Sequence, residues 1–487
     1  MKNEAVVGAI WTLVDRFGGQ ALSFVSFVIL ARLLLPADYG IVALATAIIA
    51  IPLPLNGGFS TALVQRESLR DEHVNAAFWA NIILSLCFVT IFMMGADWIA
   101  KLARVPSLAP ILRALSVTLV PLGLASVAGA FFLRRIRYSA FALRTVVAQT
   151  TCAMVAIAFA LLSFGVWALV AQQLSYAVVS MLVLWVGSHW RPRLAFSAAA
   201  FCDIFRFSAS TMAGNFLRFA YEQVDVLIIG LFLSPTSVGL YYLAQRLLLT
   251  VNAVTFAPID SVMMPLLSRL QSDHSRLRHA YLQMMWGGAC LWVPAVAGLG
   301  TTAPRILDLL FGNKWQGATG LLMLMSTTAV TTCFTRPTRE ILLAVNCAEI
   351  YAVISSGQLV LTIAAFLIGV QYALVGCGAA YAIVSALVVP FHLYAVKQHT
   401  GITPREVVVP LLPIFGAGAF MAAATYGTGQ VAGLDKLTVV VAQIAAGLLV
   451  YPVALYFLAP DQTRMAMASL SHLVPVRFRV GRGQPRT

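Results

Sequence analysis

Four charged residues lie within an apolar stretch, residues 214–249, that is long enough to cross a membrane. They are Arg218, Glu222, Asp225 and Arg246. A charge at bilayer depth costs roughly 2.5–3.5 kcal/mol on insertion scales, so such residues usually face a partner or a water-filled cavity. The first three are spaced i, i+4, i+7 and therefore share one helical face. Arginine can hold a phosphate through forked donors.

The chain repeats itself at an offset of 199 residues. Pro36 and Gly40 recur as Pro235 and Gly239, within apolar segments of similar composition. The repeat predicts two related halves. Because six predicted spans precede the second half, both halves enter the membrane in the same direction. This is a parallel repeat about an axis along the membrane normal.

A further pair of charges, Asp15 and Arg16, lies in the first apolar stretch. At 1.5 Å per residue, Arg16 lies roughly 15 Å into its span and Arg218 roughly 18 Å into the equivalent span. The repeat then predicts that the two arginines face each other between the halves, where a transporter binds its substrate. The alternative is purely structural pairing, of Asp15 with a neighbouring arginine and of Arg218 with Glu222.

Proline and glycine interrupt corresponding spans of the two halves. These residues are Pro52, Pro54, Gly57 and Gly58 in the first half and Pro258 in the second. Interrupted helices at matching positions indicate a midplane site with moving parts, and we predict hinges there. The alternative is that proline and glycine are simply frequent in membrane helices.

The composition indicates that most of this chain lies within a lipid bilayer. It has 487 residues, of which 60% are hydrophobic and 10% charged, and a mean hydropathy of +0.87. Soluble domains carry about 25% charged residues. We predict an all-α polytopic membrane protein with about fourteen spans. The expected spans are 8–33, 39–64, 75–100, 108–133, 145–164, 166–187, 207–233, 238–265, 281–303, 317–343, 350–370, 372–396, 407–427 and 436–459.

Five regions follow from these spans. We predict an N-terminal six-helix bundle (1–187), a cytoplasmic linker (188–206), a second six-helix bundle (207–400), two extra helices (401–460) and a basic cytoplasmic tail (461–487). Of the 32 lysines and arginines, 22 fall in the links that lie inside if the N-terminus is inside, against 7 outside. By the positive-inside rule, both termini are cytoplasmic.

The net charge of +14 does not indicate nucleic acid, because the cations are spread over short links. Attraction to anionic inner-leaflet lipid explains them. The seven histidines lack metal-ligand spacing, no predicted outer loop is long enough for a polar catalytic domain, and no phosphate-binding glycine motif is present. We therefore predict no enzyme, no metal and no cofactor.

Several segments resemble the polysaccharide transporter family, the Wzx-like oligosaccharide flippases of the MATE-like flippase superfamily. They are GAIWTLVDRFGGQ with ARLLLPADYGIVALA (8–45), GFSTALVQRE (58–67), YEQVDVLIIGLFLSPTSVGLYYLAQRL (221–247), APIDSVMMPLLSRLQSD (257–273) and ILLAVNCAEIYAV (341–353). The resemblance spans about residues 5–400. At Leu231 the chain departs from the arginine that such proteins often carry after the glycine of IIG.

The resemblance implies a MATE-like fold and alternating-access flipping of undecaprenyl-diphosphate-linked oligosaccharide across the bacterial inner membrane, for exopolysaccharide, capsule or O-antigen synthesis. Polymerase and chain-length proteins are implied partners. A diphosphate needs midplane cations, so Arg16, Arg218 and Arg246 are the candidate ligands. Candidate carriers of a coupling proton or cation are Asp15, Glu222, Asp225 and Asp260. The alternatives are a drug or cation antiporter of the same fold, and a membrane-embedded enzyme or scaffold of polysaccharide synthesis.

Overall fold

The two repeated segments each begin a helix in the computed structural model, and each of these helices begins with a proline. Pro36 opens helix α3 (Pro36–Ile49) and Pro235 opens helix α11 (Pro235–Arg269). Proline suits the first turn because its missing N–H has no helical partner there. Asp38 accepts the Leu35 amide at 2.9 Å, and the Ser234 hydroxyl accepts the Ser237 amide at 3.2 Å. Equivalent residues therefore start equivalent helices.

The structure describes residues 18–66, 69–134, 138–188, 190–193, 195, 197–430 and 435–460, and within these ranges the elements are all helical. The α-helices besides α3 and α11 are α2 (Gly19–Leu33), α4 (Leu53–Gln65), α5 (Asp71–Leu102), α6 (Leu108–Ser116), α7 (Leu119–Arg134), α8 (Tyr138–Leu161), α9 (Trp167–Ser188), α10 (Ala198–Phe232), α12 (His274–Leu310), α13 (Thr319–Thr328), α14 (Thr332–Ala344), α15 (Ala348–Gly369), α16 (Ala373–Thr400), α17 (Pro404–Val408), α18 (Leu412–Gly429) and α19 (Lys436–Leu458). Short 3₁₀ turns are η2 (Asn313–Ala318), η3 (Ala329–Thr331), η4 (Val370–Tyr372) and η5 (Val409–Leu411).

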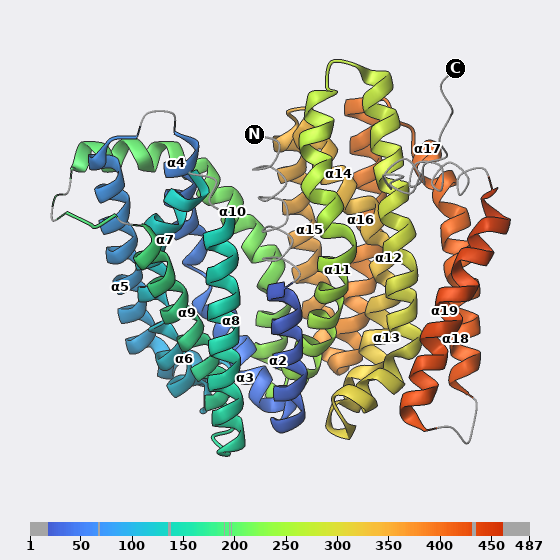
Figure 1. Cartoon of the computed structure of the whole chain (residues 1–487), viewed down its shortest axis with the longest axis horizontal. Coiled ribbons are helices and arrows are strands. Elements are labelled where there is room, and N and C mark those ends of the chain that lie inside the picture. The colour runs from blue at the N-terminus through green and yellow to red at the C-terminus, as the bar shows by residue number, and fades with distance from the viewer. Residues whose placement is uncertain are drawn as a thin grey trace, which may run out of the picture.

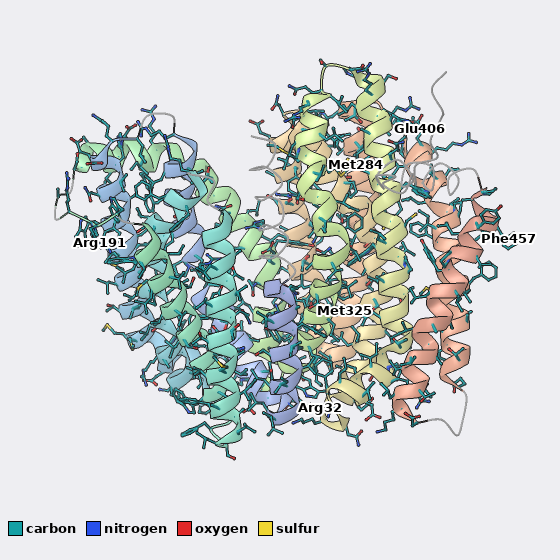
Figure 2. The ribbon with its side chains drawn as sticks, viewed as in Figure 1. Arg32, Arg191, Met284, Met325, Glu406 and Phe457 are labelled. Carbon is teal, nitrogen blue, oxygen red and sulfur yellow. The ribbon has the colours of Figure 1, made fainter. Side chains whose placement is uncertain are left out.

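The helices form two lobes and an outlying pair (Figure 1). The first lobe contains α2–α9, the second contains α11–α16, and α18 and α19 pack together against α12. The ribbons of the lobes diverge toward one end of the molecule and converge at the other. Glu406 lies toward the first end and Arg32 at the second (Figure 2), and we call these the Glu406 end and the Arg32 end.

Helix α10 crosses from one lobe to the other. Its first turns pack on α4 and α5, where Ile204 and Met212 join a buried cluster that includes Phe59 and Phe78. Its later turns contact α15 and α11. The latter half of the predicted linker, 188–206, is therefore helical where it is described, and it lies against the first lobe.

The fourteen-span count stays a prediction. In the described part of the chain, ten helices are long and apolar enough to cross a membrane, or eleven if the bent pair α3 and α4 is one span. Helices α15 and α16 are counted there as a single stretch, Ala348–Thr400, although η4 separates them. Helix α10, which carries five charged residues along its length, is not among the ten. The protein is nevertheless a multi-pass, all-α membrane protein.

The predicted interruption occurs in one of the two matched spans. Helices α3 and α4 meet at a 52° bend. Pro52 caps α4 and Pro54 follows in its first turn, where proline is tolerated. Helix α11, by contrast, continues without a break through Pro258. The expectation of a matching break in the second half is therefore wrong for the helix as it stands.

Candidate functional site

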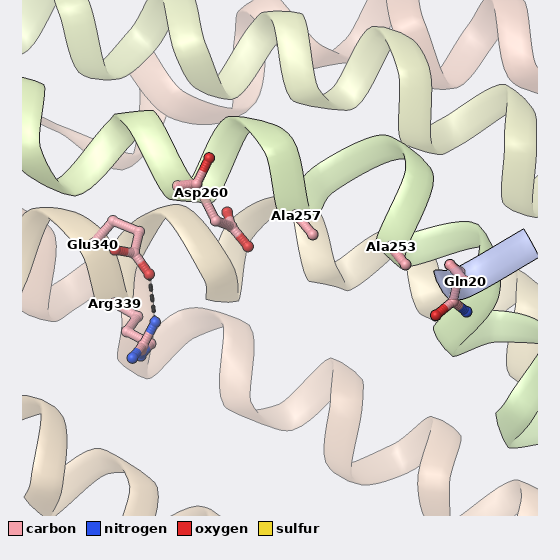
Figure 3. Close-up of a pocket in the computed structure, with 7 residues that line it drawn as sticks. Gln20, Ala253, Ala257, Asp260, Arg339 and Glu340 are labelled. Carbon is pink, nitrogen blue, oxygen red and sulfur yellow. Dashed lines mark hydrogen bonds and ion pairs between the residues drawn. The ribbon is translucent and has the colours of Figure 1, made fainter. Parts of the chain in front are cut away.

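A cavity of about 440 Å³ lies between the lobes, beside the start of α2 (Figure 3). Small residues of α11, Ala253 and Ala257, leave room for it, because their side chains end at one carbon. Gln20 of α2 closes one side. The remaining lining residues are polar or charged: Asp260 and Ser261 of α11, and Arg339 and Glu340 of α14. The wall is therefore built from both halves of the repeat.

Two ion pairs involve lining residues of this cavity: one joins α14 to α11 through Arg336, which does not itself line the cavity, and the other lies within α14. Arg336 donates to Asp260 at 2.8 Å, and Arg339 donates to Glu340 at 2.6 Å. The two carboxylate side chains are largely buried, 17% and 6% exposed, whereas the two arginines are 39% and 45% exposed. The arginines thus retain accessible donors. A carboxylate on the wall occupies a guanidinium that could otherwise hold a phosphate, since both anions use the same forked donors.

Asp260 keeps one unused acceptor. Its Oδ1 is buried and has no hydrogen-bond partner among the described residues. A buried polar atom without a partner is unfavourable unless water, a proton or a ligand group satisfies it. Asp260 was predicted as a proton or cation carrier, and the structure does place it on a cavity wall.

Arg218 and Glu222 form an ion pair at 3.6 Å on α10, one turn apart. Their side chains are 65% and 52% exposed, and neither lines the 440 Å³ cavity. The neighbouring Tyr221 hydroxyl accepts a hydrogen bond from Gln358 of α15 at 2.7 Å, which ties this turn to the second lobe. The pairing is the one that the structural alternative predicts. An exposed i, i+4 pair contributes only about 0.3–0.5 kcal/mol, so both side chains remain available for other partners.

Asp225 lies in different surroundings although it shares the helical face of Arg218. It is 8% exposed, and its carboxylate accepts the Tyr241 hydroxyl at 2.6 Å and the Gln245 amide at 3.3 Å. Its second oxygen accepts the Val226 backbone N–H at 2.7 Å. Three donors satisfy a buried carboxylate well. Asp225 therefore joins α10 to α11, and the structure does not bring it into the cavity.

Arg246 lies at the contact between α11 and α2. Its guanidinium donates to the Ser23 hydroxyl at 2.5 Å, and one turn further Gln20 donates to Thr250 at 3.5 Å. The repeat predicts Arg16 and Arg218 between the halves, whereas Arg246 was named only as a further candidate ligand for a diphosphate. Asp15 and Arg16 lie outside the described residues.

The predicted hinge residues have unequal surroundings. A side-chain carbon on Gly58 would overlap the Met212 side chain, so this glycine allows α4 to approach α10 closely. Nothing lies closer than 4.0 Å to such a carbon at Gly57. Whether these residues and Pro258 move is a separate, untested prediction. In the described ranges, no group of three or more His, Cys, Asp or Glu side chains could hold a metal ion.

The predicted site residues do not include Gln20, Arg336, Arg339 or Glu340. A signal was available, because the three charged residues fall inside the predicted span 317–343, where a charge is as costly as at Arg218. The positive-inside count places Arg336 and Arg339 in an inner link instead. Gln20 carried no such signal, since a lone glutamine in an apolar helix is unremarkable.

Comparison with known sequences identifies relatives along most of the chain. A family model described as polysaccharide biosynthesis protein matches residues 29–319. The succinoglycan biosynthesis transport protein ExoT of Rhizobium meliloti is 30% identical over 318 residues, covering 65% of this chain and 64% of that protein, slightly less than two thirds of its length. The lipopolysaccharide biosynthesis protein WzxC of Escherichia coli is 23% identical over 378 residues, covering 77% and 76%.

Solved structures share the fold. The lipid II flippase MurJ in an inward closed conformation matches with a TM-score of 0.78 at 15% identity, covering 94% of this chain and 99% of that one. A multidrug resistance MATE transporter in an inward-facing conformation matches with a TM-score of 0.61 at 16% identity, covering 81% and 94%. At these identities the likeness shows the fold alone, which is MATE-like as predicted.

Proposed function

The chain belongs to the polysaccharide biosynthesis protein family, and from that premise we propose that it is a flippase for a lipid-linked polysaccharide precursor. The cargo is an oligosaccharide on undecaprenyl diphosphate. The observation that carries this proposal is the cavity between the lobes, whose wall presents Arg339 and whose lining residue Asp260 is paired with Arg336. Arg336 and Arg339 are 39% and 45% exposed, so their guanidinium groups keep donors for an anionic cargo besides the carboxylates that they hold.

A diphosphate fits this wall better than a cationic drug does. Arg339 on the wall and Arg336 beside Asp260 offer accessible guanidinium donors for a diphosphate, and the polar residues Gln20 and Ser261 suit sugar hydroxyls. Arg246, at the contact with α2, and Arg218, on α10, lie outside the lining of this cavity and stay candidate ligands from the resemblance. A site for an organic cation needs acidic and aromatic groups free of arginine.

Transport proceeds by alternating access, with no covalent chemistry and so no enzymatic step. Cargo enters from the Glu406 end, where the lobes diverge, and leaves at the Arg32 end. Asp260 is the proposed carrier of a coupling proton, because its unpartnered Oδ1 can accept one and its protonation would weaken its hold on Arg336. Asp225, Glu222 and Asp15 remain weaker candidates for coupling.

The proposed location is the bacterial inner membrane with both termini in the cytoplasm, so the Glu406 end faces inward. Reporter fusions at Arg193 and Lys397 are expected to report cytoplasm, and fusions at Lys101 and Lys314 the outer side. An outer signal at Arg193 contradicts this orientation. Association with polymerase and chain-length proteins stays a prediction from the resemblance.

Reconstitution in liposomes tests the function directly. The liposomes contain undecaprenyl-diphosphate-linked oligosaccharide, and a membrane-impermeant glycosidase measures how fast the inner pool reaches the outer leaflet. We expect faster exposure with the protein than in protein-free liposomes, and little exposure of the same oligosaccharide on a neutral lipid. Exposure at the protein-free rate contradicts the proposal. Transport of a lipophilic dye cation without transport of the glycolipid supports the antiporter instead.

A further inference from the structure

The residues that reveal the repeat also contact each other across the two lobes at the Arg32 end. A side-chain carbon on Gly40 would overlap the carbonyl oxygen of Pro235, and one on Gly239 would overlap the carbonyl oxygen of Pro36. The same added carbons would lie 2.9 Å from the Gly239 nitrogen and 3.2 Å from the Gly40 nitrogen. The contact is thus reciprocal. Only glycine lets the first turns of α3 and α11 approach so closely.

An aromatic cluster covers this contact. Phe27 of α2 and Tyr39 of α3 come from the first half, and Tyr242, Phe311 and Trp315 come from the second. The ring centroids of Tyr39 and Tyr242 lie 6.2 Å apart, those of Tyr39 and Trp315 5.5 Å apart, and those of Phe27 and Phe311 5.7 Å apart. Such distances are typical of favourable aromatic pairs. The cluster excludes water from the Arg32 end of the seam between the lobes.

Hydrogen bonds between the halves complete the closure. The Trp315 indole donates to the Ala31 carbonyl at 2.8 Å, and the Lys314 ammonium donates to the Arg32 carbonyl at 2.6 Å. In return, the Arg32 guanidinium donates to the Leu310 carbonyl at 2.8 Å and to the Leu309 carbonyl. All four acceptors belong to the last turns of α2 and α12, whose carbonyls lack helical partners.

Because the Trp315 indole and the Ala31 carbonyl are buried in the closed seam, the groups freed when these bonds break are hydrated only if the lobes separate there. The last carbonyls of a helix that ends near the membrane surface can be hydrated, as can an arginine or a lysine at the same level. The glycine contact itself involves backbone atoms, whereas the aromatic side chains of the two halves pack against each other in one buried core, so opening must separate these rings.

We propose that Pro36–Gly40 and Pro235–Gly239 form a reciprocal gate, placed on the pseudo-twofold axis, that must open for access from the Arg32 end. The two glycines allow the closed state, and the aromatic cluster with Arg32, Lys314 and Trp315 holds it. The identity of the cargo does not enter this inference. Gly40 and Gly239 recur at the same offset because each one makes room for the backbone of the other.

Adding one methyl group to either glycine tests the gate. Gly40→Ala and Gly239→Ala should hinder closure and raise the population that is open at the Arg32 end. Gly287→Ala is the matched control, because Gly287 also lies inside a helix of the second lobe but a carbon there meets nothing within 4 Å. All variants are made in a functional form of the protein whose seven cysteines have been replaced.

The readout is a cysteine in the cavity, Ala257→Cys, labelled by a membrane-impermeant maleimide on intact cells, from the side that the predicted orientation assigns to the Arg32 end. If the open state is a minor one of a few per cent, each gate variant should raise the labelling rate roughly tenfold over the Gly287→Ala control. Gate variants that accumulate normally and label at the control rate overturn the proposal. This readout needs no cargo, so a wrong assignment of the substrate leaves it valid.

A cross-link provides a second test that does not depend on the glycine variants folding. Tyr39→Cys with Tyr242→Cys joins the two halves through a short, reducible thiol cross-linker. Phe159→Cys with Phe164→Cys is the control, since these rings lie 5.1 Å apart within one lobe. Linking the first pair should stop glycan export until reductant is added, and linking the control pair should not. Export that continues at the control rate with the first pair linked overturns the gate.

Discussion

Removal of the Arg336 guanidinium is the sharpest test of the cargo site. Arg336→Ala deletes a cation that is 39% exposed and that donates to Asp260 at 2.8 Å. A hydrogen bond to a charged group contributes about 1.5–3 kcal/mol, and each 1.4 kcal/mol changes binding tenfold. Because Arg336 is partly hydrated, the lower part of this range applies. We expect the apparent KM for undecaprenyl-diphosphate oligosaccharide to rise about tenfold.

The stability effect of the same change is separable. Exposed ion pairs contribute about 0.2–1 kcal/mol, whereas removal of one partner from a fully buried pair costs about 3–5 kcal/mol. The Arg336–Asp260 pair lies between these limits, and the carboxylate left behind is the more buried member. Asp260→Asn together with Arg336→Ala should therefore recover stability relative to Arg336→Ala, because the uncompensated anion is gone. It should not recover transport.

Liposome transport and thermal unfolding in detergent measure the two effects on one preparation. Arg336→Lys should restore part of the affinity, since an ammonium keeps the charge but not the forked geometry. Arg278→Ala is the matched control, because Arg278 also pairs with a carboxylate, Glu406 of α17, but neither member of that pair lines the cavity. Normal transport by the double variant would show that Arg336 only neutralises Asp260, and the binding role would be withdrawn.

Three further changes test other parts of the molecule. Arg218→Ala is expected to reduce glycan export while the protein accumulates normally. The exchange Arg218→Glu with Glu222→Arg should keep accumulation without restoring export. Full export by the exchanged variant would show that the pair is only structural. Asp225→Asn should lower the unfolding temperature in detergent, because weakening the bonds from Tyr241 and Gln245 leaves buried polar groups poorly satisfied at a cost of about 1–3 kcal/mol; a variant of unchanged stability that cannot transport would instead support ion coupling. The hydrogen bond from Arg66 lowers the pKa of Asp203 below its ordinary value. The contact therefore stabilises the fold at pH values above the ordinary aspartate pKa. This contribution is lost as the pH falls through the lowered pKa of Asp203. The unfolding temperature of the wild type should therefore fall more steeply on acidification than that of Asp203→Asn, and parallel curves would contradict the assignment.

Membrane class, helical fold and the existence of a repeat could all be predicted from the sequence, because each is a local or periodic property. Apolar segments of membrane length have few alternatives to a helix, since every backbone polar group must be satisfied internally in lipid. Pro36 and Pro235, at a constant offset, mark equivalent helix starts because proline is tolerated in the first turn of a helix, where its missing N–H has no helical partner. The bend between α3 and α4 also follows from local chemistry, because Pro52 and Pro54 cannot continue the preceding helix.

Which charges share a cavity was decided only by the tertiary structure. Arg218 and Asp225 have the same helical phase, yet one is exposed and the other is buried against Tyr241, because burial depends on what α11 brings to that turn. Arg336 and Asp260 are far apart in sequence, and no periodicity relates them; they meet because α14 packs on α11. The repeat residues themselves show the same limit. Their recurrence indicated two halves, but only the fold shows that Gly40 and Gly239 each face the backbone of the other half.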